Sequence, residues 1–207
     1  YGTTPDVSNL QATKQIHKLN YFITFGRNSS LLIGLVSASL LIFASTELIK
    51  FFEPTTSVSI KANSYLILRS LGLPFYLLNM HSTAVLRGMK YPKITLYSSA
   101  IVGVVNVILS YFLGVVLNYG VEGIAIASSI AFLISSIYST KVLISTQIQT
   151  SNLVESHEKK EIRKKFFSIG FFIFIRSMFL TLFMAYLRNQ ASLMSMLSLI
   201  HISEPTR

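Results

Sequence analysis

The sequence contains no cysteine and only a small share of charged residues, and both shortages narrow the class of protein. Without cysteine, the chain cannot build a disulfide framework or a thiolate metal site. Charged residues make up 13% of the chain, whereas a soluble domain carries about 25%. Hydrophobic residues make up 51%, and the mean hydropathy is +0.56. These figures place the chain among membrane proteins.

Acidic residues are the scarcest charged group, with 8 Asp and Glu against 18 Lys and Arg. The formal net charge of +10 would suit a nucleic-acid-binding protein, but such proteins are not this apolar, so we expect no nucleic-acid partner. No acidic residue lies deep in a long apolar segment, and no HExxH, GxSxG or Gly-rich phosphate-binding motif occurs. A membrane-embedded hydrolase would need such an acid, base or nucleophile. The sequence therefore predicts that the chain is not an enzyme.

Five apolar stretches are long enough to cross a bilayer, which takes about 20 helical residues. They are Ser29–Ile49, Ser64–Leu86, Ile94–Leu117, Val121–Ser145 and Phe166–Leu187. Each is too long for a strand and too apolar for a surface helix. Buried helices of a soluble protein are the alternative, but five such segments leave no polar outer layer. The sequence predicts an all-α, multi-pass integral membrane protein, built as a helix bundle in contact with the lipid bilayer.

Basic residues gather in alternate connections between these stretches. The second connection carries Arg87, Lys90 and Lys93 and no acidic residue. The N-terminal segment and the charged connection Gln147–Lys165 also carry more basic than acidic residues. We expect Gln147–Lys165 to be a solvated loop or helix face. Because basic loops stay on the cytoplasmic side, all three segments are predicted to face the cytoplasm.

Polar residues recur inside the stretches at spacings of three and four, which places them on one face of a helix. The second, third and fourth stretches contain such stripes: Tyr65, Arg69, Gly72, Tyr76, Asn79 and Thr83; Ser99, Gly103, Asn106, Ser110 and Gly114; and Ser128, Ser135 and Ser139. Small residues at this spacing favour close helix packing. Larger polar residues such as Asn79 and Asn106 are costly to bury in lipid and favour a polar cavity. The sequence leaves both interpretations of the stripes open, close helix packing and a polar cavity.

Two further polar residues lie inside the stretches. Arg176 is near the centre of the fifth, where it costs at least about 2.5–3.5 kcal/mol on insertion scales and needs a partner or water. It either acts in function or fixes the packing of helices. His81 lies opposite the polar stripe of its own stretch, and we expect a structural role for it.

Both ends of the sequence suggest that it is an incomplete translation of its gene. The chain begins at Tyr1 rather than at Met, so we expect residues before it. Its last segment, Leu197–Arg207, reads LSLIHISEPTR and resembles a translated sequencing adapter. We expect this tail not to belong to the natural protein.

The middle of the chain resembles transporters of the multidrug and toxic compound extrusion (MATE) family. The resemblance lies in YLILRSLGLPFYLLNMHSTAVLRGMKYPK and in VVNVILSYFLGVVLNYGVEGIAIASSI. The residues that match the family's structural motif are Pro74, Arg87, Gly88, Pro92, Gly120 and Gly123. The fifth stretch, with Arg176, resembles the seventh helix of the branch that is similar to DNA-damage-inducible protein F.

The resemblance implies a partial MATE-type fold, with about five helices of an expected twelve. Residues 1–145 would hold the end of helix two and helices three to six of the N-terminal lobe. Residues 146–165 would form the cytoplasmic inter-lobe loop, and residues 166–196 the first helix of the C-terminal lobe. Residues 197–207 would be the adapter-derived tail. The rest of the second lobe would be the partner that this chain lacks.

The resemblance also implies a function, that of a secondary active antiporter. Such a protein exports small-molecule substrates, namely drugs, xenobiotics or organic acids, by alternating access. It uses no cofactor beyond coupling to protons or sodium. One alternative is a lipid-linked oligosaccharide flippase of the same superfamily, and another is a non-transporting membrane protein or membrane enzyme.

The candidate residues for the substrate or ion cavity follow from the stripes and from the resemblance. They are Asn106, Ser110, Ser128, Asn79, Tyr76, Arg69 and Arg176. Ser110 replaces the Asp that the family usually carries four residues after its Asn, which puts ion coupling through this lobe in doubt. Ser128 stands where the family usually has Thr. The two arginines, with no buried acid, favour an anionic substrate.

Overall fold

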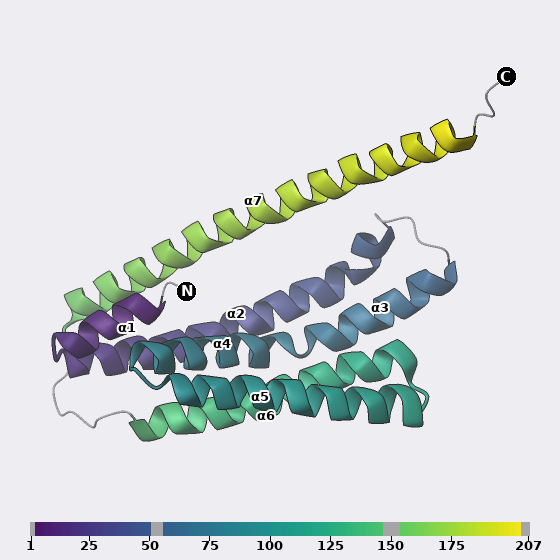
Figure 1. Cartoon of the computed structure of the whole chain (residues 1–207). Helices are drawn as coiled ribbons and strands as arrows, with labels where there is room; N and C mark the ends of the chain where they lie inside the picture. The colour runs from purple at the N-terminus through teal and green to yellow at the C-terminus, as the bar shows by residue number, and fades with distance from the viewer. Residues whose placement is uncertain (1–2, 51–55, 147–153, 204–207) are drawn as a thin grey trace. The chain divides into compact units, whose positions relative to one another are not determined.

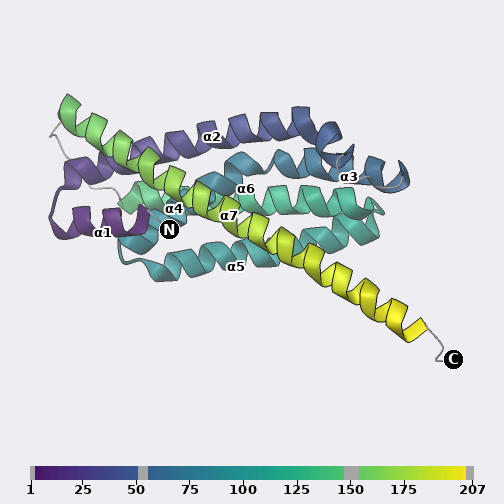
Figure 2. The ribbon, with the colours of Figure 1, turned by 90° about the horizontal axis from the view of Figure 1, so that it is seen from above.

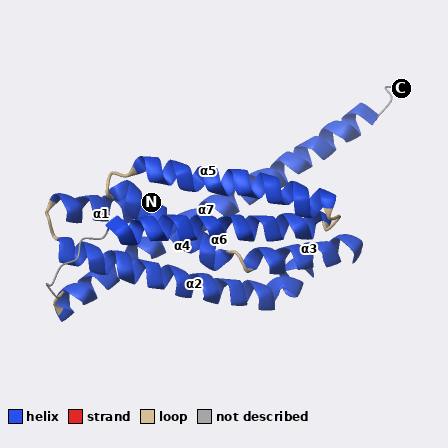
Figure 3. Ribbon diagram, turned by 90° about the horizontal axis from the view of Figure 1, so that it is seen from below, coloured by secondary structure: helices blue, strands red, loops and turns tan. Residues whose placement is uncertain are grey.

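The computed structural model describes residues 3–50, 56–146 and 154–203, and every regular element in these ranges is a helix (Figure 3). The all-α class predicted from the sequence is therefore confirmed. The chain divides into two compact units, Thr3–Ile162 and the residues from Arg163 onward. Helices suit a membrane because each satisfies its backbone hydrogen bonds within its own segment.

The first unit is a bundle of helices (Figures 1 and 2). In chain order they are α1 Thr3–Ala12, α2 Ile16–Lys50, α3 Thr56–Ser70, α4 Leu73–Gly88, α5 Pro92–Leu109, the π-helix η1 Ser110–Val116 and α6 Gly120–Thr146. Helix α2, the continuous stretch Pro92–Val116 and helix α6 are long and apolar enough to cross a membrane. They confirm the first, third and fourth predicted spans.

Small residues line the interior of this unit, and large apolar residues cover its exterior. Ser98, Ser135 and Ala127 are fully buried, whereas Phe43 is 86% exposed and Val107 is 72% exposed. A soluble protein shows the reverse pattern in its core. Small interior residues let helices approach closely in lipid, where there is no hydrophobic drive between helices. The burial pattern therefore agrees with a membrane location.

The second predicted span, Ser64–Leu86, is not one continuous helix, and this prediction was wrong. The chain breaks at Leu71 and Gly72, between α3 and α4. Pro74 lies in the first turn of α4, where it has no N–H to donate and its ring excludes the carbonyl of the preceding turn. Two shorter helices in series thus replace the single predicted span.

Helix α6 satisfies the backbone at this break. The N–H of Gly72 donates to the carbonyl of Arg69 over 3.2 Å, which frees the carbonyl of Leu68 from its usual helical partner. The hydroxyl of Ser129 on α6 donates to Leu68 O over 3.1 Å. A Cβ at Gly72 would lie only 2.6 Å from Ser129 Oγ, so the absence of a side chain permits this close approach. Neighbouring Ser and Thr commonly satisfy broken helices in membranes in this way.

The third predicted span ends in a different helical form. Helix α5 starts at Pro92, as predicted, and the chain continues from Ser110 as the π-helix η1. The predicted tight turn follows, with Asn118 at φ +58° and Gly120 at φ +56°. Both lie in the left-handed region, which Gly and Asn adopt at the lowest cost. The turn lets α6 return along α5.

The basic segments predicted to share a side lie at the same end of the first unit. The hydroxyl of Thr4 on α1 donates to the carbonyl of Ala84 near the end of α4 over 3.1 Å. Lys18 Nζ at the start of α2 lies 2.9 Å from Glu158 Oε1, which follows the long connection. The shared side is therefore confirmed. That it faces the cytoplasm stays a prediction.

Helix α7, Ser156–Ser203, begins within the first unit and forms the second unit from Arg163 onward. Its part Ser156–Met184 is long and apolar enough to cross a membrane, which confirms the fifth predicted span. The helix starts at Ser156 rather than at Phe166, so the charged run is a helix face and not a loop. Residues 147–153 of the predicted inter-lobe loop and residues 204–207 of the predicted tail lie outside the described residues.

Candidate substrate cavity

A buried cluster of one amide and three hydroxyls joins α4, α5 and α6. Asn79 Oδ1 accepts hydrogen bonds from Ser98 Oγ at 3.0 Å, Ser135 Oγ at 3.2 Å and Ser139 Oγ at 3.0 Å. The hydroxyls of Ser98 and Ser135 also lie 2.7 Å apart. All four residues are buried. Since three donors converge on one oxygen, the orientation of the Asn79 amide is fixed.

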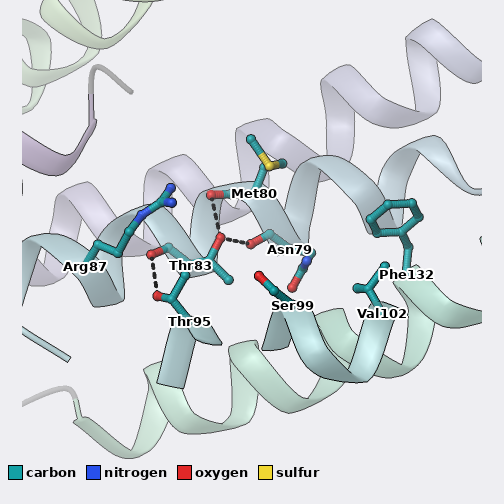
Figure 4. A pocket seen from close by; sticks show the side chains of 8 residues that line it. All are labelled: Asn79, Met80, Thr83, Arg87, Thr95, Ser99, Val102 and Phe132. Atoms are coloured by element: carbon teal, nitrogen blue, oxygen red, sulfur yellow. Dashed lines mark hydrogen bonds between the residues drawn. The ribbon is translucent and has the colours of Figure 1, made fainter. Parts of the chain in front are cut away.

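Beside this cluster lies a polar pocket of about 230 Å³ between α4, α5 and α6. Its lining residues are Asn79, Met80, Thr83, Arg87, Thr95, Ser99, Val102 and Phe132 (Figure 4). The hydroxyl of Thr83 donates to the carbonyl of Asn79 at 2.8 Å, and the hydroxyl of Thr95 donates to the carbonyl of Thr83 at 3.3 Å. The stripe on the second stretch therefore faces a cavity at Asn79 and Thr83.

Two predicted cavity residues meet at one aromatic ring of this pocket. The guanidinium of Arg69 lies 5.3 Å from the ring centroid of Phe132, a cation–π distance. The ring of Tyr76 packs edge-on against the same ring, with centroids 5.0 Å apart. Arg69 Nη1 is buried with no hydrogen-bond partner among the described residues. Phe132 thus contacts Arg69 and Tyr76 and also lines the polar pocket, whereas Arg69 and Tyr76 are not among the lining residues.

A second polar cluster lies where α5 passes into η1. Asn106 Nδ2 donates to Ser128 Oγ over 3.2 Å, and Ser110 Oγ donates to Asn106 Oδ1 over 2.8 Å. Ser128 Oγ in turn donates to the carbonyl of Ile124 at 3.0 Å. The three candidates predicted here are therefore in contact. Their role in binding stays a prediction, although π-helical segments recur at functional sites.

The structural-motif residues lie at the turns and close approaches of the first unit. Pro74 and Pro92 each stand in the first turn of a helix. A Cβ at Gly88 would lie 2.7 Å from Thr4 O, and one at Gly123 would lie 2.7 Å from the carbonyl carbon of Leu113. These glycines let α1 meet α4 and let α6 meet η1. Gly120 supplies the positive φ of the turn.

Two other sequence predictions have separate outcomes. His81 is buried against α2, with Nε2 3.2 Å from the carbonyl of Ile23, and a Cβ at Gly26 would collide with its ring. This contact agrees with a structural role. Arg176 lies on α7 in the second unit, so the structure does not join it to the clusters of the first.

The sequence pattern misses two residues of the site. Ser98 is fully buried in the Asn79 cluster, but the predicted stripe passes through its neighbour Ser99. The adjacent serines Ser98 and Ser99 are the sequence feature that could have pointed to Ser98. For Phe132 no signal distinguishes it from the lipid-facing aromatic residues. Among the described residues, no group of three or more His, Asp or Glu could hold a metal ion.

Polar groups buried between membrane spans are costly and commonly mark substrate or ion pathways. The sequence matches the family model described as MatE over residues 1–112. The chain therefore belongs to the MatE family, a family of membrane transporters, and is a multi-pass integral membrane protein.

Two known proteins are similar to parts of the chain. The lipid II flippase MurJ of Thermosipho africanus (strain TCF52B) is 32% identical over 123 residues, which is 58% of this chain and 26% of that protein. A multidrug resistance MATE family transporter of the MOP superfamily, solved in an inward-facing conformation, matches the fold with a TM-score of 0.71 and 16% identity. The match covers 82% of this chain and 39% of the solved one. The chain thus spans well under half the length of either relative.

Proposed function

We propose that the protein containing this chain is a secondary active antiporter that exports drugs, xenobiotics or organic acids by alternating access. The observation that carries this proposal is the polar pocket between α4, α5 and α6, in a chain of the MatE family. At about 230 Å³ the pocket is smaller than the roughly 300–1,000 Å³ that enclose a drug-sized ligand. It fits one wall of a larger binding cavity.

In this proposal α1 to α6 form part of one lobe, and α7 begins the other lobe. The two lobes rock against each other and expose the cavity to one side of the membrane at a time. Downhill movement of protons or sodium supplies the energy. The serine-rich contacts between α4, α5 and α6 keep the first lobe rigid while it moves.

The test is transport by the complete protein in proteoliposomes. Uptake of a fluorescent organic cation and of citrate is measured under an imposed proton gradient, under a sodium gradient and with no gradient. We expect accumulation that depends on one of the gradients. If neither compound moves under any gradient, while the protein is folded and correctly inserted, the antiporter proposal is wrong.

Ion coupling through this lobe is tested by the substitution Ser110→Asp. Ser110 contacts Asn106, which contacts Ser128, so a carboxyl here would join an existing hydrogen-bond network. We expect transport by Ser110→Asp to change several-fold with pH in the range where the new carboxyl takes up a proton. Ser110→Asn has a similar size and cannot ionise, so it serves as the control. Identical pH profiles for the two variants would contradict this prediction.

The similarity to the MurJ flippase favours a second candidate, the transport of a lipid-linked saccharide. The two functions differ in substrate, because a flippase moves its cargo between leaflets rather than into solution. A fluorescent lipid-linked oligosaccharide in proteoliposomes reports this movement when a membrane-impermeant quencher is added. Loss of the protected fraction only in vesicles with the protein would favour the flippase.

A further inference from the structure

The pocket beside Asn79 has an unusual balance of charge. Its eight lining residues include one cation, Arg87, and no acid. The sequence contains no Asp or Glu between Glu53 and Glu122, so α3, α4, α5 and η1 carry no negative side chain at all. Lys90 and Lys93 follow Arg87 in the turn and in the first turn of α5. No side chain on these helices offsets the positive charge at this end of the pocket.

Two polar side chains of the pocket keep a free donor, namely Asn79 and Ser99. The three serine hydroxyls occupy Asn79 Oδ1, which leaves the Nδ2 group of the same amide without an acceptor among the described residues. Ser99 lines the pocket, and its hydroxyl makes no hydrogen bond to any described residue. The hydroxyls of Thr83 and Thr95 already donate to carbonyls. An anionic group at this place can therefore accept hydrogen bonds from the N–H of Asn79 and the O–H of Ser99.

Arg87 supplies the charge that completes this set. It lies in the last turn of α4 and is exposed, and its guanidinium makes no ion pair or hydrogen bond within the part of the chain that the structure describes. A cationic ligand would be repelled here, whereas an anionic oxygen group would find both charge and donors.

We propose that this pocket binds the anionic oxygen group of the transported molecule, a carboxylate or a phosphate. Arg87 is the charged anchor, and Asn79 and Ser99 donate hydrogen bonds. This inference rests on the proposed transport function and narrows its substrate to anions. The volume of about 230 Å³ suits an acid group with a small body. A soluble organic acid and the headgroup of an anionic lipid share this chemistry.

The experiment measures equilibrium binding to the purified complete protein, independently of transport. Radiolabelled citrate is the soluble probe, and a fluorescent phosphatidylglycerol in phosphatidylcholine nanodiscs is the lipid probe. The variants are Arg87→Gln and Ser99→Ala. Lys93→Gln is the matched control because it removes the same charge close by but does not line the pocket.

We expect Arg87→Gln to weaken binding of one probe by about tenfold or more, since hydrogen bonds to charged groups are the strong ones. Ser99→Ala should weaken it by about threefold, and Lys93→Gln by less than about twofold. Citrate binding that follows this order assigns the pocket to a soluble acid, and phosphatidylglycerol binding that follows it assigns the pocket to a lipid headgroup. Equal losses in Arg87→Gln and Lys93→Gln would mean general surface charge and would overturn the proposal.

Failure of this inference is distinguishable from failure of the proposed function. If the protein transports only organic cations and binds neither probe, the antiporter proposal stands and the anion-pocket proposal is wrong. If the protein binds citrate with the expected order of losses among the variants but transports nothing, the anion-pocket proposal stands and the antiporter proposal is wrong.

Discussion

Gly34→Leu is expected to prevent α2 from packing against α4 and to destabilise the bundle severely. A Cβ at Gly34 would lie 2.5 Å from Pro74 Cα, which is backbone and cannot turn aside as a side chain does. Overpacking of this kind costs about 1–3 kcal/mol or more. We expect a lower midpoint of thermal unfolding in detergent and loss of the monodisperse peak in size-exclusion chromatography.

Gly103→Leu is the matched control for this prediction. Gly103 also lies within a membrane-spanning helix, but beyond the neighbouring backbone of its own helix no atom of the described residues lies within 4 Å of a Cβ built at this position. Leu favours a helix over Gly by roughly 0.5–1 kcal/mol, so the thermal midpoint should stay or rise. If both variants lose the same amount of stability, the contact between Gly34 and Pro74 is not what limits packing.

The second large effect is expected from Asn79→Leu. This change removes the oxygen that accepts hydrogen bonds from Ser98, Ser135 and Ser139 and leaves buried hydroxyls to find other partners. Hydrogen bonds between membrane helices contribute on average about 0.6 kcal/mol each, so three of them amount to roughly 2 kcal/mol. The measurement is the thermal midpoint of the complete protein in detergent.

Asn63→Leu controls for the removal of an amide from this group of helices. Asn63 lies on α3, and its Oδ1 has no hydrogen-bond partner among the described residues. We expect little change in the thermal midpoint, since no bond is lost. An equal loss in Asn63→Leu and Asn79→Leu would show that the serine cluster does not hold α4, α5 and α6 together.

The parts of the site that the sequence predicts are those set by helical periodicity, by residues that restrict the backbone locally, or by the family resemblance. Asn106 and Ser110 are four residues apart on one helix, so their contact follows from the pitch of the helix. Ser128 is expected in the same cavity from the family resemblance, and the structure places it in contact with Asn106. The sequence also predicts the turn at Gly120 and the helix start at Pro92, because both residues restrict the backbone locally.

The parts that the sequence could not predict depend on which helix lies opposite. The ring of Phe132 contacts both Arg69 and Tyr76, and these contacts depend on the position of α6 against α3 and α4. Ser98, rather than Ser99, enters the Asn79 cluster because of the rotation of α5 about its own axis. Rotations of this size are set by packing, and a stripe on a single helix does not define them.

The break between α3 and α4 escapes prediction for a different reason. Pro74 belongs to the predicted motif, but the apolar length of Ser64–Leu86 favours one continuous span. A prediction from apolar length treats each span as one unbroken helix, because an unbroken helix leaves no backbone group unsatisfied in lipid. In this bundle the hydroxyl of Ser129 takes over the carbonyl of Leu68, so the cost is removed without continuity.

This break has a mechanical consequence. A continuous helix behaves as a stiff rod, and a push at one end reaches the other almost undiminished. At Leu71 and Gly72 the ladder of backbone hydrogen bonds is interrupted, so the rod has a joint near its middle. The half that carries Arg69 contacts Phe132 of α6, and the half that carries Arg87 is bound to α5 and α6 through Asn79. Each half is therefore held in the bundle by its own contacts, and a load on one half passes into α6 rather than along a continuous rod.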